Sequence, residues 1–90
     1  MNKERRKALA DLVDRLNGIT GMIEDIKFEI EYLKDEEQEY YDNMPESLQG
    51  GEKGDRACEA VDQLDNAISN LDDVVSNIEE AVSYIENASE

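Results

Sequence analysis

The second half of the chain repeats itself every seven residues: AVDQLDN (60–66), AISNLDD (67–73), VVSNIEE (74–80) and AVSYIEN (81–87). In a heptad abcdefg each block begins at g, so apolar residues fill both a and d. The a positions are Val61, Ile68, Val75 and Val82, and the d positions are Leu64, Leu71, Ile78 and Ile85. Apolar residues three and four positions apart share one face of an α-helix. The repeat therefore predicts a coiled-coil-like helix over about residues 55–88.

The columns beside this seam differ sharply. Position e is acidic at Asp65, Asp72, Glu79 and Glu86, whereas position g is small and apolar at Ala60, Ala67, Val74, Ala81 and Ala88. The buried stripe is therefore expected to be three residues wide and displaced toward g. A pair of helices would leave the g column in water, so this column is the candidate dimer face.

The first half has the same spacing. Leu9, Leu16, Ile23 and Ile30 occupy a, and Leu12, Ile19, Ile26 and Leu33 occupy d. This alternation predicts a second helix over about residues 3–42, with an a/d seam and with Gly18 and Gly21 on its outer face. The seam ends at Glu37, which is the one charged residue in it.

Residues 43–54 connect the two helices. Pro45 disfavours helical geometry at the preceding residue, and Gly50, Gly51 and Gly54 permit the positive φ angles of a turn. A single connection predicts an antiparallel hairpin. In an antiparallel pair of helices, the numbers of facing residues add up to a constant. A register in which this sum is 94 places Leu33 opposite Val61, and it leaves fewer apolar side chains without an apolar partner than a register in which the sum is 101.

The predicted fold class is all-α: one domain over residues 1–90, an antiparallel two-helix hairpin. A lone pair of rods has a seam but no interior, so two hairpins are expected to pair into a dimeric four-helix bundle through the alanine-rich g column. A monomer and a higher oligomer are the alternatives.

Charge and composition limit the function. The 90 residues hold 24 Asp and Glu against 9 Lys and Arg, a formal net charge of −15, with one Cys and no His. Direct binding to nucleic acid needs a basic face, and zinc sites or acid–base catalysis commonly use His. We therefore expect no enzyme activity, no cofactor and no metal site. No apolar run is long enough for a membrane span, so a cytoplasmic protein is expected.

Residues 35–49, DEEQEYYDNMPESLQ, are the least repetitive part of the chain. An acidic run, Gln, aromatic residues and an Asn-Met-Pro-Glu turn precede a heptad-rich acidic helix. In this the sequence resembles small uncharacterised helical-hairpin proteins of bacteriophages and prophages. The resemblance covers roughly residues 35–88 and is specific only at the tip. It implies a phage origin and a helical hairpin, and it brings no established activity.

An acidic face is the first candidate site. It comprises Asp65, Asp72, Asp73, Glu79, Glu80 and Glu86. A rigid row of carboxylates can imitate a phosphate backbone and occupy the basic groove of a DNA- or RNA-binding protein. The simpler interpretation is a solvated face that maintains solubility.

The tip is the second candidate site. Tyr40, Tyr41, Met44 and Leu48 could dock a partner, since aromatic and Met side chains are favoured in interface cores, or could fold back and close the end of the hairpin. The basic residues near the N-terminus suggest either charge pairing with the acidic second helix or an anion-binding patch. Cys58 is either a small filler or an intersubunit disulfide.

Two functions are therefore carried forward. The first is a non-enzymatic, phage-type binding protein whose DNA-mimic-like surface antagonises a host nucleic-acid-handling or defence protein. The second is a structural or adaptor bundle, such as a virion assembly factor or chaperone, that contacts its partner through the tip or the g column.

Overall fold

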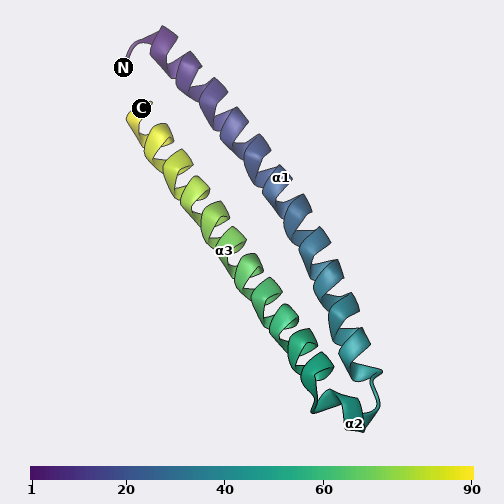
Figure 1. Cartoon of the computed structure of the whole chain (residues 1–90). Helices are drawn as coiled ribbons and strands as arrows, with labels where there is room; N and C mark the ends of the chain where they lie inside the picture. Colours follow the sequence, from purple (N-terminus) through teal and green to yellow (C-terminus); the bar gives the residue numbers. More distant parts are fainter. The chain divides into compact units, whose positions relative to one another are not determined.

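The computed structural model describes all 90 residues, and it contains helices and no strand. Helix α1 is Lys3–Asp42, α2 is the short Glu46–Gln49 and α3 is Glu52–Ala88 (Figure 1). None of the three helices combines the length and the apolarity needed to cross a membrane.

Local hydrogen bonds define the helix ends. The Asn2 side-chain oxygen accepts a bond of 2.8 Å from the Arg5 backbone N–H, which caps the start of α1. Pro45 follows the end of α1, and its carbonyl accepts the backbone N–H groups of Leu48 at 2.8 Å and Gln49 at 3.1 Å, which opens α2. Pro45 has no N–H to donate and a φ of −56°, so it suits the entry to a helix.

The glycines of the connection work differently from the prediction. No residue of the chain has positive φ, and Gly50 lies at −84°. Gly54 is instead required by close packing, because a Cβ built there would lie 1.9 Å from the Gln49 carbonyl oxygen. The Gln49 side-chain amide in turn donates a bond of 3.0 Å to the Tyr41 carbonyl. The turn is therefore closed by a tight backbone contact and not by left-handed geometry.

The chain forms two compact units, each of which holds a part of α1 and a part of α3. The terminal unit comprises Met1–Asp25 with Leu71–Glu90, and the turn unit comprises Ile26–Asn70. In the turn unit Lys34 of α1 pairs with Asp65 of α3 at 2.8 Å, and Tyr41 lies beside Cys58. In the terminal unit Arg6 and Val13 of α1 share a hollow with Glu86 of α3.

Helix α3 buries the stripe that its sequence predicts. All eight a and d residues from Val61 to Ile85 are half-buried, as are Ala60, Ala67 and Ala81 of the g column. Ala57 is 2% exposed, and it is the one apolar side chain of the chain that is fully buried. The tightest packing therefore lies in the turn unit, next to Gly54.

The predicted a/d seam of α1 is wrong at d. The a positions are half-buried, but Leu12, Ile19, Ile26 and Leu33 are 42%, 46%, 49% and 54% exposed. The e positions are half-buried in their place, which corresponds to a rotation of α1 by about 50° at 100° per residue.

The cause lies in the e column of α1, where the Lys34 ammonium group reaches Asp65 and the Tyr41 side chain lies beside Cys58. The Lys34–Asp65 and Tyr41–Cys58 contacts both join residue numbers that sum to 99. The observed sum of 99 lies between 94 and 101, the sums of the two registers in which a positions face d positions. The register differs from both because e positions of α1, and not its d positions, contact α3.

Candidate protein-binding surface

The six carboxylates of the predicted acidic face are all exposed. Asp65 belongs to the turn unit, and the other five, Asp72, Asp73, Glu79, Glu80 and Glu86, belong to the terminal unit. Heptad spacing places successive e carboxylates about 10.5 Å apart along the helix. The helix thus carries its charges outward at regular intervals.

Asp65 is a member of the acidic face that pairs with a residue of α1. Its carboxylate accepts a hydrogen bond of 2.8 Å from the Lys34 ammonium group, and this bond raises the pKa of Lys34. The Lys34 charge offsets that of Asp65 locally. Glu80 accepts a weaker bond of 3.3 Å from the Tyr84 hydroxyl, which leaves its negative charge in place. In the terminal unit, Glu79, Glu80 and Glu86 follow one another along α3 with no base between them.

Helix α3 has little positive charge of its own. It holds ten Asp and Glu but two bases, Lys53 and Arg56, and both bases precede the acidic series. Arg56 is paired within the helix to Glu52. Over the last 30 residues of α3 every charged side chain is therefore an acid.

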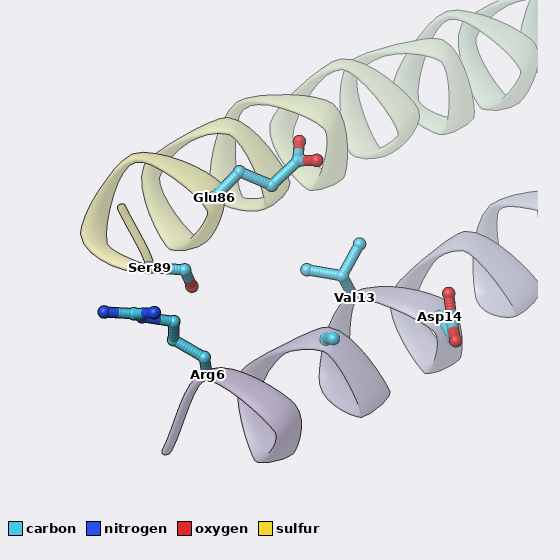
Figure 2. Close-up of a pocket in the computed structure, with 6 residues that line it drawn as sticks. Arg6, Val13, Asp14, Glu86 and Ser89 are labelled. Atoms are coloured by element: carbon cyan, nitrogen blue, oxygen red, sulfur yellow. The ribbon is translucent and has the colours of Figure 1, made fainter. Parts of the chain in front are cut away.

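A hollow of about 390 Å³ in the terminal unit is lined by Arg6, one of the basic residues near the N-terminus. Figure 2 shows the Arg6 side chain beside Ser89, at the carbonyl end of α3, with Val13 directed toward α3. Glu86 lines the same hollow. A helix C-terminus and a carboxylate both attract a cation and repel an anion. This placement favours charge neutralisation over an anion-binding patch.

The four tip residues divide into two pairs. Tyr41 and Met44 are half-buried, and the nearby Cys58 thiol and partial burial raise the pKa of the Tyr41 hydroxyl. Tyr40 and Leu48 are 51% and 46% exposed. Cys58 itself is a free, exposed thiol. Tyr41 and Met44 thus pack within the turn unit, and Tyr40 and Leu48 remain available to a partner.

The g column of α3 is also divided. Ala60, Ala67 and Ala81 are half-buried within the single chain, whereas Val74 is 40% exposed and Ala88 is exposed. Part of the column predicted to form a dimer face is therefore already covered.

The sequence prediction missed an exposed apolar surface on α1. Met22, Phe28 and Tyr32 are 64–65% exposed, and the d residues described above are exposed as well. Two shallow hollows lie among these residues. One, in the turn unit, is lined by Phe28, Glu29, Tyr32 and Leu33, and the other, in the terminal unit, by Leu12, Arg15, Leu16 and Ile19 of α1 with Ile85 of α3. The signal was present, because Met22, Phe28 and Tyr32 are large apolar residues at g, f and c, positions expected to face water.

No group of three or more side chains of the metal-binding types is close enough to hold an ion. No protein-family model, curated protein or solved structure matches the chain. The chemistry of the surface therefore carries the functional inference.

Proposed function

We propose that the protein is a non-enzymatic binding protein that acts through the acidic face of α3 on a basic, nucleic-acid-handling protein. The observation that carries this proposal is the continuous exposure of Asp73, Glu79, Glu80 and Glu86 on a helix segment that contains no base. A rigid helix holds these charges at fixed spacing, whereas a flexible acidic tail would pay an entropic cost to align them.

A partner that normally grips phosphates offers Lys and Arg in a groove. A row of carboxylates about 10.5 Å apart matches the field of a phosphate backbone and not its atomic spacing. Occupation of such a groove excludes the nucleic acid, so the protein acts as an antagonist. The tip's resemblance to phage proteins makes a host defence enzyme a suitable class of target.

The architecture proposed for this role is an antiparallel helical hairpin that pairs into a four-helix bundle. The Lys34–Asp65 and Tyr41–Cys58 contacts support the hairpin, since the residue number rises along α1 as it falls along α3. Burial supports the dimer, since one fully buried apolar side chain is too little core for a helical protein of this length.

Affinity capture from host lysate at rising salt concentration tests the function. The binding variant carries Asp73→Asn, Glu79→Gln, Glu80→Gln and Glu86→Gln. The control carries the same number of amide replacements on α1, at Glu4, Asp11, Asp14 and Asp35, which are also exposed. We expect nucleic-acid-handling proteins to be captured by the wild type and the control, to be released by salt, and to be lost with the α3 variant. Equal capture by the two variants would contradict the proposal.

The exposure of Tyr40 and Leu48 favours a second candidate, an adaptor that contacts its partner through the tip. Tyr is enriched in binding hot spots, and an exposed Tyr and an exposed Leu in the tip each offer an apolar contact that salt does not weaken. Capture that survives high salt but is lost on Tyr40→Ala with Leu48→Ala would favour the adaptor over the antagonist.

A further inference from the structure

We propose that α1 carries a self-association face, and that a second copy of the chain covers it with its own α1 running in the opposite direction. The inference rests on the proposed dimeric assembly and assigns it a different surface from the alanine-rich column of α3.

The first part of the face lies in the terminal unit. Leu12 and Ile19 are more than two-fifths exposed, and with Leu16 and Ile85 they line a hollow whose one charged residue is Arg15. The patch is therefore apolar with a single positive charge at its edge.

The second part of the face lies in the turn unit. Phe28, Tyr32 and Leu33 line a hollow whose one charged residue is Glu29. Phe28 and Tyr32 are each 65% exposed, and a hydrogen bond to Glu36 and the charge of that carboxylate raise the pKa of the Tyr32 hydroxyl. This patch is apolar with negative charge at its edge, from Glu29 and from Glu36 beside Tyr32, so it complements the first.

When the α1 helices of two copies run in opposite directions, the terminal-unit patch of one copy lies against the turn-unit patch of the other. If Ile19 of one α1 stands level with Ile26 of the other, Leu12 stands level with Leu33, and Arg15 lies within one residue of the level of Glu29. A twofold axis makes every one of these contacts twice, as an isologous interface requires.

The charge distribution along α1 favours the same arrangement. Residues 3–21 hold five bases and three acids, whereas residues 22–42 hold two bases and nine acids. Antiparallel pairing of two α1 helices sets the basic half of one on the acidic half of the other. Pairing through α3 would instead bring two strongly acidic helices together, which costs free energy through like-charge repulsion.

The whole chain exposes more surface than a compact monomer of its mass. The chain exposes 6697 Å² at a mass of 10.2 kDa. A compact monomer of that mass exposes about 5,300 Å², so the excess is about 1,400 Å². A standard interface takes about 800 Å² from each partner. The excess of the whole chain is therefore larger than the share that one partner gives to a standard interface.

Charge reversal tests the pairing by sedimentation equilibrium. The wild type is expected to be a dimer. Arg15→Glu alone, or Glu29→Arg alone, places like charges opposite each other twice and weakens dimerisation by about tenfold or more. An equimolar mixture of the two variants restores the dimer, because every contact in the mixed pair is again between opposite charges. The double variant dimerises like the wild type.

Two controls separate this contact from other causes. Lys53→Glu makes the same change in net charge as Arg15→Glu, but at an exposed position on α3, and is expected to leave the dimer intact. Circular dichroism checks that each variant keeps its helicity, since all three sites are exposed.

Several results would overturn the proposal: a wild-type monomer, single variants of wild-type mass, a mixture that fails to associate, or equal dissociation by Lys53→Glu. Dissociation by Ala67→Glu with Ala81→Glu but not by Arg15→Glu would assign the dimer to α3 instead. The double variant keeps the net charge and the acidic face of α3, so its capture of nucleic-acid-handling proteins tests the proposed function independently of this interface.

Discussion

Helices α1 and α3 are nearly equal in length, at 40 and 37 residues, and share the same heptad spacing, yet they hide different columns. Helix α3 has three adjacent apolar columns and an acidic e column, so a single face of it can be covered. Helix α1 has apolar a and d columns and an e column with Lys34 and Tyr41, whose side-chain contacts with Asp65 and Cys58 turn the e side inward. The d column of α1 is left exposed. A heptad pattern thus identifies the apolar side chains that are expected to be buried. Polar contacts beside the seam decide which of these side chains are buried within a single chain.

The glycines of the two helices give the largest expected difference. Gly54→Ala in α3 places a Cβ against the Gln49 carbonyl, where backbone and not a flexible side chain must move. We expect the free energy of unfolding to fall by about 3 kcal/mol in urea denaturation, as for other overpacked or strained sites. A loss below about 1 kcal/mol would show that the turn relaxes easily.

Truncation of one side chain in the exposed d column of α1 and of one in the half-buried a column of α3 compares the contributions of the two columns to stability. Ile68→Ala on α3 removes a half-buried side chain and should cost about 1–2 kcal/mol of unfolding free energy. Ile26→Ala on α1 removes one that is 49% exposed, and at concentrations where the chain is monomeric it should cost less than about 0.5 kcal/mol. Equal losses of unfolding free energy for the two variants under those conditions would show that the d side chains of α1 are buried, as its heptad pattern predicts. A loss for Ile26→Ala that grows with protein concentration would support the α1 interface.

The sequence predicted the helices well because spacing alone determines amphipathicity. The a and d residues of α3, three of its five g residues and the end of α1 before Pro45 agree with the structure, whereas Val74 and Ala88 of the g column are exposed. The rotation of α1 could not be read from spacing, since it depends on a Lys–Asp contact across 31 residues of sequence. The role of Gly54 was equally hidden, because a close approach between two backbones leaves no compositional sign that distinguishes it from a left-handed turn.

For the candidate surface, sequence located the carboxylates but not their partners. Exposure of the acidic face follows from its e and f positions, whereas the pairing of Asp65 with Lys34 depends on how α1 is rotated. The tip residues show the same limit, since adjacent Tyr40 and Tyr41 differ in burial according to the direction each leaves the helix.

Gly18→Ala on α1 should have a smaller effect of opposite sign. No atom lies within 4 Å of a Cβ built at Gly18, so the substitution adds helix propensity without a clash. We expect the free energy of unfolding to rise by about 0.5–1 kcal/mol. Gly21→Ala is a second test at an equally open position. A destabilisation at either site would mean that the outer face of α1 is covered closely enough to exclude a methyl group.

The Lys34–Asp65 pair gives the smallest effect, which appears as a pH dependence. The hydrogen bond to Asp65 raises the pKa of Lys34, so the folded state holds the lysine proton more tightly than the unfolded state does. The stabilisation is therefore complete below the pKa of Lys34 in the unfolded chain and is lost as pH rises through its higher pKa in the folded chain. In urea denaturation Lys34→Met should be less stable than the wild type at neutral pH, and the difference should narrow at alkaline pH. The pKa values of Tyr32 and Tyr41 are also raised, so ionisation of these hydroxyls also lowers the stability of the folded state as pH rises. Because this contribution is the same in the wild type and in Lys34→Met, it cancels in the difference between the two proteins. A difference that stays constant across alkaline pH would show that Lys34 acts through the packing of its aliphatic stem, and the rotation of α1 would then need another cause than this ion pair.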